Sequence, residues 1–170
     1  LQTLAIKHPE ALLIPEGGSQ QQALKGVAEI IQELTQQYDY ILAPVASGGT
    51  LAGLIDALSQ SVNPTNIKVL GIAVLKGQGY LEQLVEDLIN VNHQQVDWEI
   101  NHDYQFGGYA KSNNELNQFC VAFQQQTHIA IEPVYSGKLF YALSQLILNQ
   151  YFPKGSRVLV LHTGGLQGAR

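Results

Sequence analysis

Apolar residues follow the chain in two alternating patterns, and the first is a set of short, almost continuously apolar runs. Each run is bounded by turn residues, and the five of them are Ala11–Pro15, Tyr40–Ala46, Lys68–Leu75, Ile129–Val134 and Arg157–His162. Runs of this kind are typical of strands that are buried on both faces of a parallel sheet. The pattern therefore predicts five strands at these positions.

The stretches between these runs show helical spacing, with apolar residues recurring every three or four positions. The five apolar stripes are Ala23, Val27, Ile30, Ile31 and Leu34; Leu51, Leu54, Ile55 and Leu58; Leu81, Leu84, Val85 and Leu88; Leu116, Phe119, Cys120 and Phe123; and Leu139, Leu143, Leu146 and Ile147. Strands that alternate with helices are joined by right-handed crossovers. We therefore expect an α/β fold, an open and mostly parallel sheet with helices on both faces.

One stretch interrupts this alternation. His93–Lys111 has no clean helical or strand period, and it contains the pair Gly107-Gly108. It predicts a weak strand followed by a loop with its own turn chemistry. Asp103, Tyr104 and Tyr109 are then either part of a lid over a crevice or part of an ordinary surface loop.

Length and composition narrow the class of protein. The 170 residues suffice for one well-buried unit, so we expect a single α/β unit over residues 1–170. A net charge of −5 argues against nucleic acid or an anionic membrane surface as partner. No apolar run is long enough to span a membrane, and no basic stretch precedes an apolar run at the start. The single cysteine excludes an internal disulfide and indicates a reducing, cytoplasmic location.

Glycines concentrate in four loops that follow predicted strands. These loops are Pro15–Ser19, Ala46–Thr50, Tyr135–Lys138 and Thr163–Gly168. In an open parallel sheet, ligands bind at the carboxyl ends of the strands, where such loops meet. Four glycine-rich loops at one edge therefore predict a shared binding crevice. The histidines lack metal-ligand spacing, so we expect no metal site there.

The loop Ala46–Thr50 carries the sharpest chemical signal. It leaves a buried strand and enters a helix, and its glycines allow an anion to approach the outward-pointing amide groups closely. Ser47 and Thr50 add hydroxyl donors. The loop lacks the Gly-Lys-Ser/Thr ending of a nucleotide-binding loop and the dinucleotide-binding spacing. It favours a phosphate-bearing cofactor over a plain helix-capping turn.

Two further side chains reach the same predicted edge. Tyr135 ends a predicted strand, where a phenol can stack on a flat cofactor, relay a proton or simply plug the end of the sheet. Thr163 offers a neutral hydroxyl to the crevice or caps the segment that follows. His162 is expected to make local contacts, and Cys120 lies on an apolar stripe and is expected in the core.

Five motifs, in their order along the chain, resemble one enzyme family. They are Ile14–Ser19, Ser47–Leu54, Phe106–Lys111, Pro133–Lys138 and His162–Gly168. They resemble the 1-aminocyclopropane-1-carboxylate deaminase / D-cysteine desulfhydrase family, whose members are pyridoxal-phosphate enzymes of the tryptophan-synthase-β type. The resemblance implies pyridoxal 5'-phosphate as cofactor and a small amino acid as substrate. It also implies a tryptophan-synthase-β-like fold, incomplete in this chain.

The resemblance implies roles for individual residues. Five residues match the loop that holds the cofactor phosphate: Ala46, Ser47, Gly48, Gly49 and Thr50. Tyr135 matches the tyrosine beside the cofactor ring, which takes part in substrate handling and is our candidate catalytic residue. Ser136 and Gly164 are assigned to the cofactor site, and Thr163 matches the position that meets the pyridine nitrogen in the desulfhydrases.

Two positions separate the branches of this family. The deaminases have Glu where this chain has Ser136 and Leu where it has Thr163. A carboxylate at the pyridine nitrogen keeps it protonated and strengthens the ring as an electron sink, whereas a hydroxyl suits the loss of a good leaving group. The resemblance thus implies α,β-elimination from a D-amino acid, giving pyruvate, ammonia and sulfide. The alternatives are ring-opening deamination and a noncatalytic half-enzyme that only binds phosphate or cofactor.

The family's cofactor-bonding lysine lies in a Gly-Asn-Lys-like segment that this sequence does not contain. None of the seven lysines has that context, and Lys138, the nearest to the crevice, matches another position and is expected to be structural. The chain also begins with Leu1 and contains no methionine. We therefore expect the C-terminal part of the cofactor-binding domain, preceded by the tail of the smaller domain, to be inactive alone. Uncovered sheet edges would favour a homo-oligomer, a dimer.

Overall fold

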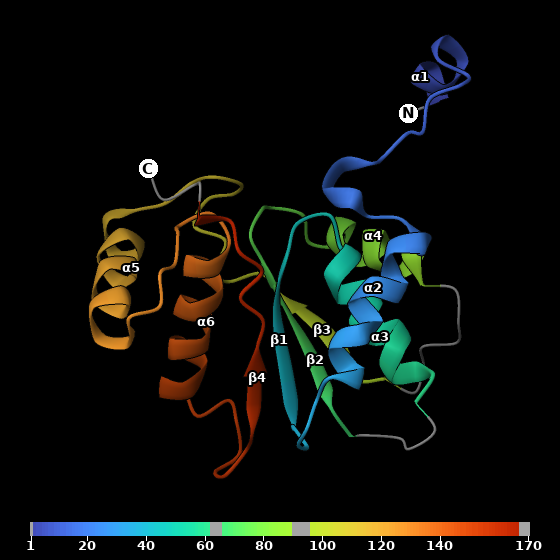
Figure 1. Ribbon diagram of the computed structural model, residues 1–170. Coiled ribbons are helices and arrows are strands. Elements are labelled where there is room, and N and C mark those ends of the chain that lie inside the picture. The colour runs from blue at the N-terminus through green and yellow to red at the C-terminus, as the bar shows by residue number, and fades with distance from the viewer. Residues whose placement is uncertain (1, 62–65, 90–95, 167–170) are drawn as a thin grey trace.

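A computed structural model describes residues 2–61, 66–89 and 96–166, and it contains one parallel sheet flanked by helices (Figure 1). The strands are β1 (Tyr40–Val45), β2 (Lys68–Ala73), β3 (Trp98–Asn101) and β4 (Val158–Val160), in the order β3-β2-β1-β4. All described pairings are parallel; Tyr40 lies opposite both Lys68 and Val158. The α/β class and the parallel sheet predicted from the sequence are confirmed.

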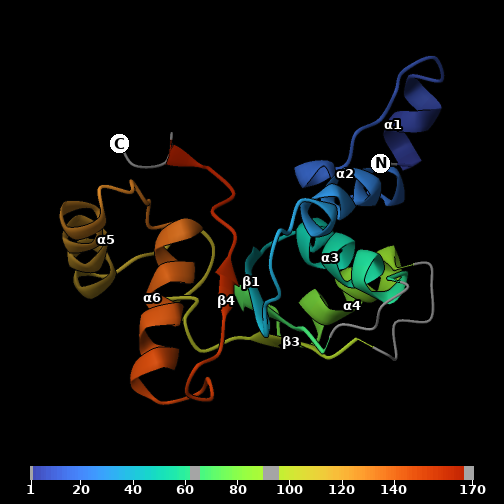
Figure 2. The same ribbon diagram turned by 60° about the horizontal axis from the view of Figure 1, so that its bottom comes forward.

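Helices cover both faces of this sheet (Figures 1 and 2). On one face lie α2 (Gln21–Gln32), α3 (Gly49–Ser59) and α4 (Tyr80–Leu88), and on the other lie α5 (Asn114–Thr127) and α6 (Ser136–Leu148). These five helices correspond to the five predicted stripes, except that Leu34 of the first stripe lies beyond the end of α2. A short helix α1 (Gln2–Lys7) and a 3₁₀ turn η1 (Glu16–Gly18) precede them, and α1 projects away from the rest (Figure 2).

The central strand explains why the apolar runs are continuous. Ile41 of β1 packs under α2 and α3, whereas the next residue, Leu42, packs under α6, and both are fully buried. Successive side chains of a strand point to opposite faces, so a strand covered on both sides needs apolar residues at every position. A third cluster, built on Leu116, Cys120 and Ile131, fills the space between α5 and α6.

Two of the five predicted strands are absent from the described residues. Ala11–Pro15 is largely exposed and leads from α1 to η1 without pairing to any described strand, so the strand prediction there is wrong. The strand predicted over Ile129–Val134 is also absent, and that prediction is wrong. Pro133 has no N–H to donate, and the amide of Val134 donates to the side chain of Glu132 at 2.5 Å instead of to a neighbouring strand.

The interrupting stretch, by contrast, contains the predicted weak strand, β3, followed by a loop. The predicted glycine loop after β4 continues through Gln167 and Gly168, and these two residues lie outside the described part of the chain. Among the described helices, none is both long enough and apolar enough to cross a membrane.

Candidate functional site

A small cavity of about 100 Å³ lies at the carboxyl end of β1, where the chain enters α3. Its lining consists of Pro44, Ala46, Ser47, Gly48, Gly49, Thr50, Tyr135 and Thr163. Seven of the residues predicted for the site therefore come together around one space. The residues Tyr135 and Thr163 reach it from far along the chain, at the start of α6 and after β4.

The start of α3 supplies hydrogen-bond donors to this cavity. Gly48 stands at the helix N-terminus with φ of 82°, in the left-handed region, and no side chain caps the helix. The first helical bond runs from the Ala52 N–H to the Gly48 carbonyl at 2.9 Å, so the amides before Ala52 have no acceptor within the helix. Free amides, the helix dipole and the Ser47 and Thr50 hydroxyls together fit a phosphate group.

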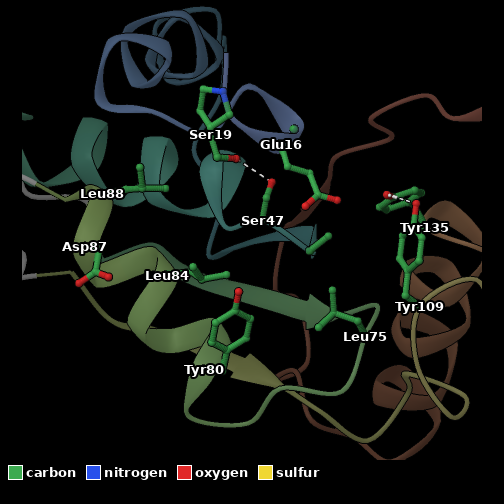
Figure 3. A pocket seen from close by; sticks show the side chains of 13 residues that line it. Glu16, Ser19, Ser47, Leu75, Tyr80, Leu84, Asp87, Leu88, Tyr109 and Tyr135 are labelled. Atoms are coloured by element: carbon green, nitrogen blue, oxygen red, sulfur yellow. Dashed lines mark hydrogen bonds between the residues drawn. The ribbon is translucent and has the colours of Figure 1, made fainter. Parts of the chain in front are cut away.

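A larger cavity of about 430 Å³ shares Ala46, Ser47 and Tyr135 with the small one (Figure 3). One wall is apolar and comes from Leu75, Leu84 and Leu88. Polar groups complete the lining, which also includes Pro15, Glu16, Gly17, Ser19, Tyr80, Asp87 and Tyr109. This arrangement provides a mostly apolar space with a few polar side chains, as small-molecule sites usually have.

The loop before α2 closes one side of this space through a close contact with Ser47. The hydroxyls of Ser19 and Ser47 are hydrogen-bonded at 2.6 Å. A Cβ atom at Gly17 would lie 2.5 Å from Ser47 Oγ, and one at Gly49 would lie 2.6 Å from Ser19 Oγ. A side chain at either position would force the facing serine hydroxyl to move, so the two glycines allow the loops to touch as they do. Ser19 was not among the predicted site residues, although the repeated Gly-Gly pattern of the two loops pointed to this contact.

Tyr135, which lines both cavities, forms a pair with Tyr109, which lines the larger one. The Tyr135 hydroxyl donates to the Tyr109 hydroxyl at 3.0 Å, and the rings meet edge to face with centroids 5.9 Å apart. Burial, the bond to Tyr109 and the nearby carboxylates of Glu132 and Glu16 raise the pKa of Tyr135 to about 12. The phenol therefore keeps its proton at neutral pH and acts there as a hydrogen-bond donor. Of the predicted lid residues, Tyr109 lines the larger cavity, whereas Asp103 and Tyr104 do not.

A buried carboxylate organises the loop that carries Tyr135. Glu132 is completely buried, and its oxygens accept from the amides of Val134 at 2.5 Å, Tyr135 at 2.8 Å and Ser136 at 2.9 Å. The Ser136 hydroxyl is turned to the same carboxylate, at 3.3 Å, and accepts from the Glu132 amide at 2.9 Å. The predicted site residue Ser136 is thus buried and lines neither cavity. Glu132 was missed by the sequence reasoning; a lone charge inside an apolar run was its signal.

The last loop is fixed by His162. Its Nε2 lies 2.8 Å from the Ala130 carbonyl and therefore donates, which leaves Nδ1 to accept from the Gly164 amide at 3.1 Å. Gly164 has φ of 87° and lies beside Thr163 without lining either cavity. His162 makes the local contacts expected of it, and they hold the backbone that presents the exposed Thr163.

Lys138, expected to be structural, is completely buried in the first turn of α6. Its ammonium donates to three backbone carbonyls, those of Val74, Gln105 and Gly108. Burial lowers its pKa to about 8, while the charge of Glu132 acts in the opposite direction. The three described acceptors use all three of its protons. Within the described ranges, no group of His, Cys, Asp or Glu side chains could hold a metal ion.

Comparisons with known proteins identify the family of the chain. Residues 2–164 match the family described as pyridoxal-phosphate dependent enzymes. A putative 1-aminocyclopropane-1-carboxylate deaminase of Pyrococcus horikoshii is 31% identical, and the match covers 92% of this chain and 50% of that protein. A bifunctional D-cysteine desulfhydrase/1-aminocyclopropane-1-carboxylate deaminase of Arabidopsis thaliana, described as mitochondrial, is also 31% identical, over 92% of this chain and 42% of that protein.

Solved structures place the chain in the same fold. The crystal structure of a homologue of 1-aminocyclopropane-1-carboxylate deaminase superposes with a TM-score of 0.75 at 29% identity, covering 99% of this chain and 53% of that one. Threonine deaminase isoform 2 from Solanum lycopersicum, at 16% identity and a TM-score of 0.57, shares the fold. The chain therefore spans about half the length of the relatives it matches.

Proposed function

The chain belongs to the pyridoxal-phosphate dependent enzymes, and on that premise we propose that it forms the phosphate-binding part of an enzyme that eliminates a β-substituent from a D-amino acid. With D-cysteine as substrate, the products are pyruvate, ammonia and sulfide. The proposal concerns the whole protein, because the chain spans about half of its relatives.

The small cavity at the start of α3 is the observation that carries the proposal. It combines free helix amides with the hydroxyls of Ser47 and Thr50, and these groups would hold the phosphate of the cofactor. When bound, pyridoxal phosphate withdraws electrons from the substrate Cα, which makes its proton acidic. The larger adjoining cavity offers room for the rest of the cofactor and an amino acid, with Glu16 and Tyr80 among its polar groups.

Thr163 supports elimination over ring opening. Its hydroxyl is neutral. It would form a hydrogen bond with the pyridine nitrogen of the cofactor but would supply no negative charge to keep that nitrogen protonated. Loss of a thiolate needs less carbanion stabilisation than ring opening. Ser136 contributes nothing to this argument, because its hydroxyl faces Glu132.

Tyr135 would act directly on the substrate. Its hydroxyl remains protonated at neutral pH, lines both cavities and is held by Tyr109, so it can hold a proton next to the reacting carbon or the leaving group. Lys138 is not proposed to bond to the cofactor, since its three protons are used by carbonyl groups. We propose that this lysine lies elsewhere in the whole protein and that the present chain alone is inactive.

The test is an assay of the full-length protein with two substrates. Sulfide release from D-cysteine supports the proposal, and Thr163→Leu should lower it at least several-fold because the leucine offers no hydrogen bond to the ring. Ammonia from 1-aminocyclopropane-1-carboxylate without sulfide from D-cysteine would replace elimination by ring opening. Cofactor binding with neither activity would favour a binding protein.

We further propose a dimeric enzyme in the cytoplasm, where a single unpaired cysteine such as Cys120 is usual.

A further inference from the structure

Lys138 joins three separate parts of the chain through one atom. Its Nζ donates to the carbonyl of Val74, just after β2, at 2.8 Å. It also donates to the carbonyls of Gln105 at 2.9 Å and Gly108 at 2.7 Å. Both belong to the loop between β3 and α5, residues 102–113, which we call the Tyr109 loop. The lysine itself belongs to α6, so one ammonium connects a strand end, a loop and a helix.

The chemistry of an ammonium suits this position. Its three protons point along three tetrahedral directions, and three carbonyl oxygens accept them, so the buried group has no unpaired donor. Burying a charge without such partners would be far more costly than burying a neutral side chain. A methionine of similar length would fill the space but would leave all three carbonyls without this donor.

The Tyr109 loop needs external support, because its backbone is strained. Phe106 and Ala110 have φ of 51° and 53°, in the left-handed region that side chains disfavour. A side-chain-bearing residue in this region is strained and persists only when its surroundings hold it. Within the loop only two backbone bonds oppose this strain, from Gly108 to the Gln105 carbonyl and from Lys111 to the Gly108 carbonyl.

The contacts of Gln105 indicate that the loop is held through its backbone carbonyl groups and not through the Gln105 side chain. Its side-chain Oε1 is buried and has no hydrogen-bond partner among the described residues, whereas its backbone carbonyl binds Lys138. The loop is therefore held at its carbonyl groups. The next residue after the held Gly108 is Tyr109, which lines the larger cavity and contacts Tyr135 there.

We propose that Lys138 is a positioning residue, whose ammonium holds the strained Tyr109 loop at the end of β2 and thereby places the Tyr109 hydroxyl against Tyr135. The placement follows from contacts within this chain and is independent of the cofactor. Its importance for catalysis rests on the proposed function. The placement of the loop and its importance for catalysis can be tested separately, because the stability of the loop can be measured without any ligand.

The test is amide hydrogen exchange, followed by mass spectrometry, on the chain without cofactor. In Lys138→Met, the amides of Gly108 and Lys111 should exchange about ten-fold faster or more, because the loop opens when its anchor is lost. Amides of β1 should keep their wild-type rates. Lys154→Met makes the same change at an exposed lysine away from the Tyr109 loop, and it should leave the exchange rates of that loop unchanged.

A second variant separates anchoring from the tyrosine contact. Tyr109→Phe removes the hydrogen bond to Tyr135 but leaves the three carbonyl bonds, so the loop should exchange within about two-fold of wild type. Faster exchange in Tyr109→Phe, with an unchanged loop in Lys138→Met, would overturn the proposal. It would show that the tyrosine pair holds the loop. Failure of the chain to bind pyridoxal phosphate would refute the proposed function while leaving these exchange rates as a valid test of the anchor.

The wild-type protein provides a test that holds even if Lys138→Met does not fold. Burial lowers the pKa of Lys138 to about 8, and a neutral amine has two protons for three carbonyls. Glu132 is the charged group that acts on Lys138, and Lys76 packs beside Gly108. Corrected for intrinsic exchange, loop protection should fall several-fold between pH 7 and 10 while that of α5 stays constant. Constant protection of the loop over this range would also overturn the proposal.

Discussion

At the scale of single residues, a change at Thr50 tests the contact with the cofactor phosphate apart from the contacts with the rest of the cofactor. It lies in the first turn of α3 and lines the small cavity. Because a hydrogen bond to a charged group contributes about 1.5–3 kcal/mol, Thr50→Val in the full-length protein should weaken pyridoxal phosphate binding about ten-fold or more. Absorbance titration measures this.

The matched comparison uses a ligand without phosphate and a threonine outside the site. Pyridoxal should bind equally to wild type and Thr50→Val, and Thr127→Val at the end of α5 should bind pyridoxal phosphate as the wild type does. An equal loss for both ligands would mean that Thr50 supports the loop without contacting the phosphate.

Cys120 allows a clean test of burial, because it is the single cysteine. Burial, and to a lesser degree the charge of Glu132, raise the pKa of its thiol to about 11. The thiolate is the reactive form, so at pH 9 iodoacetamide should modify the folded chain about fifty-fold more slowly than the unfolded chain. Since the thiol holds its proton more tightly when folded, its contribution to stability is present below pH 9 and is lost as pH rises through 11.

The control moves the thiol by one position along the same helix. The double change Cys120→Ala with Val121→Cys places it where the native side chain is 58% exposed. This thiol should react at nearly the unfolded rate, as mass spectrometry would show. Equal rates for the two positions would contradict the packing of Cys120 against Gly137, where a Cβ atom would lie 2.6 Å from its sulfur.

At the scale of elements, the sequence was sufficient wherever a local pattern decided the structure. All five helical stripes correspond to helices, because one apolar stripe must face the sheet whatever the neighbours are. The loop Ala46–Thr50 was recognisable for the same reason, since a strand, two glycines and a helix adjoin in the sequence. Its part in cofactor binding stays a prediction.

The errors arose where a side chain competed with the backbone. Ile129–Val134 resembles a buried strand, yet the Glu132 carboxylate takes the amides that a ladder would need. The same carboxylate accepts from the Ser136 hydroxyl, and the assignment of Ser136 to the cofactor site stays a prediction. Apolar periodicity contains no information on which way a short polar side chain turns.

The packing of α2 on α3 gives a prediction at this scale. A Cβ atom at Gly53 of α3 would lie 2.5 Å from Val27 Cβ of α2. Gly53→Ala should therefore destabilise the fold by about 1–3 kcal/mol in urea unfolding, although alanine favours helices. Gly26→Ala, on α2 with no atom nearby, should instead stabilise it by about 0.5–1 kcal/mol. Equal stabilisation by both would contradict the close helix contact.

At the scale of the whole molecule, the apolar surface of the first residues predicts self-association. Ile6 and Leu12 are 82% and 87% exposed, on the segment that projects from the body in Figure 2. Exposed apolar patches favour association. Light scattering of this chain should thus give a mass above that of one chain, rising with concentration.

Charge placed on that segment should reverse this association. Ile6→Glu combined with Leu12→Glu should lower the mass towards that of one chain, whereas Thr3→Glu on the same exposed helix should have little effect. A wild-type chain that remains monomeric at every concentration would contradict the prediction of a homo-oligomer for this chain.

The contact between Ser19 and Ser47 has a consequence for the order of folding. Residues near positions 17, 48, 135 and 163 must all come together before the two cavities exist, and these positions are widely separated in the sequence. Contacts between distant residues form late, because long loops must close first. Ligand binding should therefore be the last property that a refolding chain recovers, and it will mark the completion of folding.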